Sequence, residues 1–579
     1  MTAMASARSH RLTRVFGAVP TWVPVLIFYT ALALFTIGRH AIAHPRTVCA
    51  CVGGGDPALF MWGLSWWPHA IVHGLNPFVS HYLWSPTGQN TAQATLIPTA
   101  AFAMIPFTAL FGPLFSYNVL SIASPILSAL TAYLLCRRLT GRELPSIVGG
   151  YIFGFSSYEF AQLLGHLHLT LTFLIPVMVH MALRRIDREI SRRVYVIAMA
   201  LVLVLQAGLS TEVLAESTGL AAVMLVCARF LAPLPQRARI SSLTLETLGA
   251  GVLALIVASP FFYYALFSGE FPKGAGTYWD IYAQDLLNPF FPTIATWLGH
   301  HDFQSLSATY AGGGLVGDDG YLGIPLVIAF LVWALGVDRH RTLTRLVSIV
   351  AALSFFASLG AHLHIAGKQT VTLPFDWVQN LPIFNDMLPS RFALFTALAV
   401  SIGIAMWLAR STGHVVSRWL SVLLAVVMLF PNITSPLYGI PPRNPSFFAT
   451  ALFKRYLMPG ETVLVLPFGY NDISTFWQAE TGFDFYMPEG YISQVVPPPF
   501  QSEQIVDQLE QNMSPAPAEL TSFIRRHYVS HVIVDAANAG PWPELLAQMG
   551  LHARSVGGVL VYTVPGSPVL IGRVRNSRH

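Results

Sequence analysis

One acidic residue occupies the most unusual polar segment of the chain. Asp56 follows Gly53, Gly54 and Gly55 and precedes Pro57. The glycines let a backbone or a ligand approach closely, so Asp56 is a candidate for contact with a ligand. The same residues also fit a plain helix start, with Asp56 as the N-cap and Pro57 at the first helical position. Both interpretations remain open.

An aromatic stripe follows at helical spacing. Trp62, Trp66, His69 and His73 lie along one side of the helix expected after Pro57. Tryptophan at a membrane surface is typically an interfacial anchor. The same rings can stack on a sugar ring or a lipid headgroup, so Trp62, Trp66 and His69 are candidate substrate-stacking residues.

Four polar residues near the ends of apolar runs are candidates for lining a cavity: Glu159, His166, His168 and Glu212. Glu159 and His166 are seven residues apart, so one helical face would carry both. Acidic residues in a membrane span are costly and usually face a cavity or a partner. Glu212 is a candidate partner for a histidine across such a cavity. The alternative is a polar contact that only joins two helices.

A cation at the start of an apolar run is the main candidate for binding a phosphate. Arg391 stands in the sequence Leu388-Pro-Ser-Arg391-Phe, and a guanidinium can hold a phosphate through two parallel hydrogen bonds. The alternative is an arginine that snorkels at a helix end. Lys273 and Lys368 are further phosphate-binding candidates.

Metal-ligand patterns in the sequence are incomplete. Asp318 and Asp319 precede Gly320 and are expected either to cap a helix or to bind a metal. His300, His301 and Asp302 are neighbours that need a ligand from elsewhere. Cys49 and Cys51 lack the second ligand pair of a zinc site, so they either form a disulfide with each other or coordinate nothing.

The composition shows which elements must position these residues. Of 579 residues, 54% are hydrophobic and 11% are charged, whereas soluble domains carry about 25% charged residues. Apolar runs of roughly 16–22 residues alternate with short Lys/Arg clusters, as the positive-inside rule requires. The net charge of +5 therefore reflects membrane topology, and we expect no nucleic-acid partner.

The basic clusters predict an all-α polytopic protein of the cell membrane with about eleven spanning helices. Residues 1–20 form a cytoplasmic tail, and 21–432 form the transmembrane domain, with outer loops at 43–115, 268–319 and 362–390. The run Thr95–Gly112 is expected to be a shallow or re-entrant helix, because a full span there would place Arg137 and Arg138 outside. The expected spans cover residues 21–42, 116–136, 144–162, 169–184, 194–211, 215–232, 246–267, 320–337, 346–361, 391–409 and 418–432.

The last part of the chain has a different pattern. Residues 433–579 contain polar runs, prolines and shorter elements, with strands expected at 461–467, 529–535 and 559–564 and helices at 519–527 and 543–549. Helices that alternate with apolar strands predict a small α/β domain. Because the last span leads outward, this domain is expected to be extracytoplasmic.

This layout resembles the GT-C superfamily of membrane glycosyltransferases. The features that carry the resemblance are an outer loop with Asp56 just past the first span and an inward span that ends in Leu135-Cys-Arg-Arg-Leu-Thr-Gly-Arg142. The resemblance implies transfer of a sugar from a polyprenyl-phosphate donor to a glycan, lipid or protein acceptor in the cell envelope, with Asp56 as the base. The family often has paired acids in this loop, whereas this chain has one. A divalent metal is therefore an open possibility and no cofactor is certain.

A second class of function stays open from the sequence. A transporter, flippase or scaffold for a cell-envelope lipid or polymer would share the apolar spans. The sequence contains no P-loop motif and no inverted repeat of the kind found in many transporters. The long outer segments favour chemistry at the membrane surface.

Overall fold

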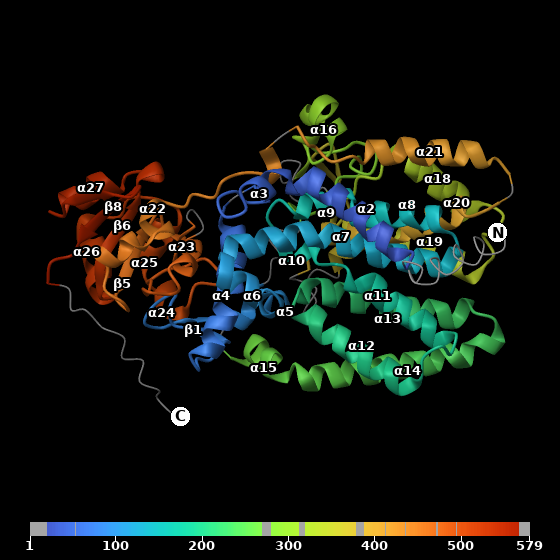
Figure 1. The fold of residues 1–579 in the computed structure, drawn as a ribbon, viewed down its shortest axis with the longest axis horizontal. Helices are drawn as coiled ribbons and strands as arrows, with labels where there is room; N and C mark the ends of the chain where they lie inside the picture. The colour runs from blue at the N-terminus through green and yellow to red at the C-terminus, as the bar shows by residue number, and fades with distance from the viewer. Residues whose placement is uncertain are drawn as a thin grey trace, which may run out of the picture.

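Long helices make up one end of the molecule and a small sheet with short helices makes up the other (Figure 1). The computed structural model describes residues 20–52, 54–268, 280–311, 319–377, 387–411, 413–434, 436–469, 473–493 and 495–566. We refer to the described part of residues 433–566 as the C-terminal lobe.

Within these ranges, six helical segments are long and apolar enough to cross a membrane. They are α2 (Trp22–Ala33) continued by α3 (Arg39–Ala43), α7 (Pro113–Thr140), α10 (Leu167–Thr170) continued by α11 (Leu174–Ile186), α13 (Thr211–Leu231), α14 (Leu234–Val257), and α20 (Ala393–Leu408) with the turn before it. Three shorter apolar helices are α18 (Ile324–Leu335), α19 (Thr342–Ser358) and α21 (Val415–Met428). Together these nine match nine of the eleven predicted spans by position.

The other two predicted spans have a different form. Residues 144–162 form two helices, α8 (Glu143–Gly154) and α9 (Ser157–Gln162), because the Ser156 hydroxyl accepts a hydrogen bond from the backbone N–H of Glu159 and starts a new helix. The segment 194–211 is the 16-residue helix α12 (Arg192–Ala207). The helix at the predicted span 246–267 begins earlier than expected, because α14 starts at Leu234 and includes the basic residues Arg237 and Arg239.

Short elements connect the long helices. Residues 95–112 form two short helices that end at Gly112, in place of one continuous helix. The connecting elements are α4 (Gly55–Val72), β1 (Val79–Ser80), β2 (Gln89–Asn90), α5 (Pro98–Ala103), α6 (Ile105–Phe111), α15 (Ser259–Phe267), α16 (Trp297–Asp302), α17 (Gln304–Ser307), β3 (His362–Ile365) and β4 (Lys368–Thr372).

The C-terminal lobe is built on a four-stranded sheet in the order β5-β6-β8-β7. β5 (Thr462–Leu466) and β6 (Val529–Asp535) are parallel, and β8 (Val559–Thr563) pairs antiparallel with both β6 and β7 (Ala553–Val556). Every residue of β5 is buried, as its unbroken apolar run predicts. The lobe also contains α22 (Ser446–Ala449), α23 (Ser474–Glu480), α24 (Pro498–Gln501), α25 (Gln504–Glu510), α26 (Pro517–Arg526) and α27 (Trp542–Gln548).

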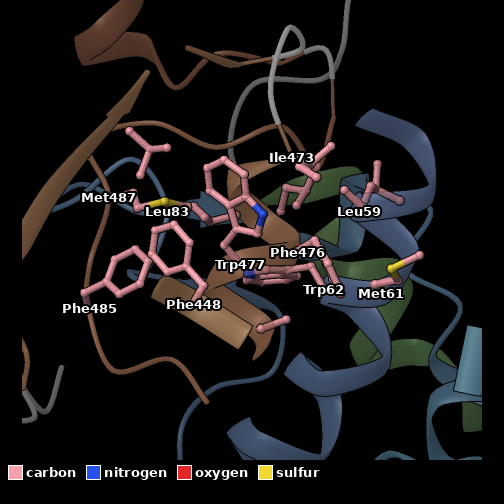
Figure 2. Close-up of a cluster of buried hydrophobic side chains, with 14 of the residues drawn as sticks. Leu59, Met61, Trp62, Leu83, Phe448, Ile473, Phe476, Trp477, Phe485 and Met487 are labelled. Atoms are coloured by element: carbon pink, nitrogen blue, oxygen red, sulfur yellow. The ribbon is translucent and has the colours of Figure 1, made fainter. Parts of the chain in front are cut away.

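One continuous apolar core joins α4 to the C-terminal lobe. Figure 2 shows Leu59 and Trp62 of α4 beside Phe476 and Trp477 of α23. The Trp62 indole also donates a hydrogen bond to the Oε1 atom of Gln478 at 2.8 Å. Since α4 begins at the residue before Asp56, this core fixes the position of the candidate base relative to the lobe.

Candidate active site

Asp56 lies in the first turn of α4 and is held from two sides. Its Oδ2 atom lies 3.3 Å from Nε2 of His166, and its Oδ1 atom accepts a hydrogen bond of 3.1 Å from the hydroxyl of Tyr491. The N-cap of α4 is Gly54, with φ +101°, so Asp56 is not the N-cap. A carboxylate in the first turn is also favoured by the helix dipole.

The surroundings keep Asp56 ionised at neutral pH. Burial raises the pKa of its carboxyl, but the hydrogen bond and charge of His166 and the hydrogen bond of Tyr491 outweigh that effect, so the net pKa is lowered. His168 lowers the pKa of Asp56 further through its charge. An ionised carboxylate with fixed orientation can accept a proton from a hydroxyl group placed against it.

A second group of charges lies beyond the two histidines. The rings of His166 and His168 are 6.5 Å apart, centre to centre. Nε2 of His168 lies 3.6 Å from Oε2 of Glu212, and Oε1 of Glu212 lies 3.8 Å from Nε of Arg391. The expectation that Glu212 pairs with a histidine agrees with this geometry. The contacts bring together side chains from α10, α13 and the turn before α20.

Arg391 is enclosed between carboxylates. Its side chain is 2% exposed, and its Nη1 atom lies 3.3 Å from Oδ2 of Asp319. The guanidinium also lies over the ring of Tyr282, with 5.4 Å from Cζ to the ring centre. Because two carboxylates already face it, the guanidinium is placed here as a buried ion-pair partner. These contacts do not test the expectation that Arg391 binds a phosphate, which stays a prediction.

Asp319 completes this buried ion-pair group. Its carboxylate also accepts a hydrogen bond from the amide of Gln162. Burial raises its pKa to about 6, against the opposing influence of Arg391 and Gln162. The expected capping role is wrong, because the following helix α18 begins at Ile324 and has Gly323 as its N-cap. Asp318 lies outside the described residues.

Glu159 lies apart from these contacts. Helix α9 ends at Gln162, before His166. The two residues therefore do not share one helical face, contrary to the argument from their seven-residue spacing. The Glu159 side chain is buried and lies beside Ser124 of α7. It therefore belongs to a contact between helices, which was the alternative expectation.

The expected stacking residues belong to the core between α4 and the C-terminal lobe. Trp62 and Trp66 stack on each other at 5.1 Å and meet the ring of Phe483 edge to face. His69 packs 4.4 Å from the same phenylalanine ring. Trp62 and Trp66 are almost fully buried, so the prediction that they stack on a substrate is wrong in this structure. Their spacing on one face of α4 was correct.

Among the described residues, the other candidate cation and the metal-ligand candidates show no contact with Asp56. Lys368 is exposed on the edge strand β4, and Lys273 lies outside the described residues. Among the residues that the structure describes, no three His, Cys, Asp or Glu side chains form a group that could hold a metal ion. Cys49 and Cys51 form a disulfide with each other, which is one of the two expected outcomes.

A cavity of about 200 Å³ lies next to the start of α4. Gly54 and Pro57, the neighbours of Asp56, form part of its wall. The C-terminal lobe contributes residues 440–443, Ile473 and Phe476 to the lining of this cavity. Mostly apolar walls with a few polar groups are typical of small-molecule sites.

The residue most easily missed from the sequence is Tyr491. It is 435 positions from Asp56, and no local spacing links the two. Gln162 was missed as well, since an amide between apolar residues has no specific pattern. The only signal for Tyr491 was an aromatic-rich segment before three prolines, which predicts an apolar core equally well.

The fold is that of the GT-C glycosyltransferases. The arabinofuranosyltransferase AftD from Mycobacteria superposes with a TM-score of 0.58 at 13% identity, over 94% of this chain and 42% of that chain. The apo oligosaccharyltransferase of Archaeoglobus fulgidus gives 0.53 at 13% identity, over 95% and 75% of the two chains. Apo ArnT from Cupriavidus metallidurans gives 0.50 at 12% identity, over 93% and 97%. This chain thus spans less than half of the arabinofuranosyltransferase.

Sequence comparison gives a narrower result. No curated protein matches the chain. One family model, described as a domain of unknown function (DUF6311), matches residues 26–430, which cover the apolar helices and α4 with Asp56. The chain therefore belongs to the DUF6311 family.

Proposed function

We propose that this chain is a membrane glycosyltransferase. It moves a sugar from a polyprenyl-phosphate donor to a hydroxyl group of a glycan, lipid or protein acceptor at the outer face of the cell membrane. Asp56 is the general base. The observation that carries the proposal is the Asp56 carboxylate, fixed by His166 and Tyr491 beside a cavity in a GT-C fold.

The chemistry requires a base next to the acceptor. The acceptor oxygen forms a bond to the anomeric carbon of the donor sugar while the bond from that carbon to the phosphate oxygen breaks. The phosphate leaves with the bonding electron pair, and the acceptor proton goes to Asp56. Removal of the proton as the new bond forms contributes about 10²–10⁴-fold to such reactions. The lowered pKa of Asp56 keeps it ready to accept the proton at neutral pH.

The buried ions behind the base have a supporting role. Arg391 faces both Glu212 and Asp319, and Glu212 in turn faces His168. The positive charge of Arg391 compensates part of the negative charge that these carboxylates bring into a buried region. We infer that these contacts help to hold α10 in place and, with it, His166 against Asp56.

The test uses the full chain in nanodiscs with a panel of polyprenyl-phosphate sugars. Wild type is compared with Asp56→Asn, which keeps the shape of the side chain but cannot accept the proton. We expect the variant to bind the same donor and to lose about 10²–10⁴-fold in kcat. Asp507→Asn, on the exposed surface of α25, is the control and should retain wild-type turnover.

Two results would count against the proposal. Turnover that is intact in Asp56→Asn would remove Asp56 as the base. A wild-type protein that moves a polyprenyl-phosphate lipid across the bilayer without consuming its sugar would favour the transport alternative.

A further inference from the structure

The hydrogen bond between Tyr491 and Asp56 joins two parts of the chain that are far apart in sequence. The phenol comes from the C-terminal lobe, and the carboxylate comes from the first turn of α4. The family match covers residues 26–430, so Tyr491 lies outside it. The site described above therefore includes one group that the family-defining region does not supply.

The backbone around Tyr491 is held against the loop between β1 and β2. The backbone N–H of Trp84 donates to the carbonyl of Glu489 at 3.1 Å, and that of Ser85 donates to the carbonyl of Met487 at 2.9 Å. The Trp84 indole donates to the carbonyl of Gly490 at 3.0 Å. These bonds resemble a short strand pairing, and they fix the segment immediately before Tyr491.

Side chains on both sides of this pairing add to its rigidity. The rings of Tyr82 and Tyr486 stack at 4.6 Å with 7° between their planes. Gln89 donates to the hydroxyl of Ser493 at 3.1 Å and to the carbonyl of Val495 at 2.8 Å. Tyr491 therefore lies between anchored neighbours, so the position of its hydroxyl is set by the lobe's packing on the β1–β2 loop.

Gly490 makes this close approach possible. Its φ is +141°, and a Cβ atom added there would lie 2.5 Å from Cδ2 of the buried Leu83. A side chain at this φ would be strained and would crowd Leu83. Glycine therefore suits the position immediately before Tyr491.

We propose that Tyr491 is a positioning residue of the candidate site, through which the C-terminal lobe orients the Asp56 carboxylate. This inference rests on the proposed function, because it gives the lobe a part in the same reaction. Tyr491 holds Oδ1 while His166 holds Oδ2, so the carboxylate has one fixed plane. A base fixed in this way requires less reorganisation when the acceptor binds.

The other groups that face Asp56 do not replace the phenol. His166 and His168 approach from the segment after α9, and Tyr117 faces Asp56 from α7. The histidine contacts remain when the tyrosine hydroxyl is removed. The expected consequence is a carboxylate that is still present and paired but is more basic and less well oriented.

The experiment compares Tyr491→Phe with Tyr456→Phe in the full-length protein in nanodiscs. The first variant removes only the hydroxyl at Asp56. The second removes a hydroxyl elsewhere in the lobe, from a tyrosine whose ring packs on Phe447 and lies under Arg554. The Asp56 carboxyl is titrated by ¹³C NMR with labelled aspartate, and Asp56→Asn identifies its signal. The pH profile of kcat and the KM for the donor are measured in parallel.

Loss of a hydrogen bond to the ionised form raises the pKa of a carboxyl. We expect the pKa of Asp56 to rise by about one unit in Tyr491→Phe and the acidic limb of the kcat profile to move up by the same amount. The KM for the donor should stay within about twofold, since the phenol holds the base and not the donor. Tyr456→Phe should match wild type in every measurement.

The outcomes separate this inference from the proposed function. An unchanged Asp56 titration in Tyr491→Phe overturns the inference, and so does an equal change in both variants, because only packing of the lobe would then matter. A wild-type protein that consumes no donor overturns the proposed function instead. In that case the NMR titration still decides whether Tyr491 positions the carboxylate.

Discussion

Replacement of Arg391 by methionine should destabilise the protein strongly, for a reason that the structure makes specific. The guanidinium lies 3.3 Å from Asp319 and 3.8 Å from Glu212, in a region where Arg391 is 2% exposed. Methionine fills similar space but leaves two buried carboxylates without their cation. Removal of one partner from a buried ion pair costs about 3–5 kcal/mol in the free energy of unfolding, and we expect a loss in this range at pH 8.

The loss should depend on pH with a definite sign. Burial raises the pKa of Asp319 to about 6 in the folded protein, above an ordinary value of about 3.9 in the unfolded chain. Arg391 opposes that rise, so its removal raises the pKa further. The folded variant then binds a proton that the unfolded chain does not. The loss of unfolding free energy in Arg391→Met relative to wild type should therefore be largest at pH 8 and should shrink as the pH falls towards 5.

The assay is denaturant-induced unfolding in detergent, followed by circular dichroism at several pH values between 5 and 8. The control is Arg410→Met, which breaks the more exposed ion pair with Asp338 and should cost about 1 kcal/mol or less. Combining Arg391→Met with Glu212→Gln and Asp319→Asn should recover most of the stability, because no buried charge is then left unpaired. Equal losses in both arginine variants, or no recovery in the combined variant, would refute the charge-balance argument.

Three further predictions concern the contact between the C-terminal lobe and the rest of the chain. Burial raises the pKa of Glu480 to about 7, so stability should rise as the pH falls from about 8 to 5, and Glu480→Gln should weaken that dependence in thermal unfolding. Gly490→Ala, with its positive φ and a Cβ that would meet Leu83, should cost about 1–3 kcal/mol in chemical denaturation. Trp62→Phe leaves the buried Oε1 atom of Gln478 without its hydrogen-bond donor and should cost a similar amount of unfolding free energy, measured as a lower midpoint of unfolding. An unchanged midpoint in Gly490→Ala or in Trp62→Phe would contradict the packing described here.

The sequence predicted the apolar helices well and their interruptions poorly. Hydropathy and basic clusters located nine of the eleven predicted spans at segments that are apolar helices in the structure. It failed at residues 144–162 because hydropathy averages over Ser156, whose hydroxyl ends one helix and starts the next. A single capping contact weighs little in an 18-residue window but decides the local backbone.

The candidate site was predicted in parts. Asp56, His166, His168 and Glu212 were named from residue type and position, and the structure links them through two histidine–carboxylate contacts and a pair of neighbouring histidines. Tyr491 as the partner of Asp56 and Asp319 as the partner of Arg391 were not predictable, because these contacts depend on how segments far apart in the sequence pack together. The same limit explains why Trp62 was predicted to stack on a substrate. Helical spacing shows which residues share a face, but not whether water, lipid or protein covers that face.

The shared core of α4 and the C-terminal lobe has a consequence for biosynthesis. Asp56 and Tyr491 are 435 positions apart, so at translation rates of about 5–20 residues per second the ribosome needs roughly 20–90 seconds to pass from one to the other. During that interval the aromatic face of α4 is in place without the residues that bury it. We expect lipid or a chaperone to cover that face until the lobe is made. If translation stops before the lobe, the tryptophans of α4 stay exposed, and we expect proteases that remove misfolded proteins to degrade the truncated chain.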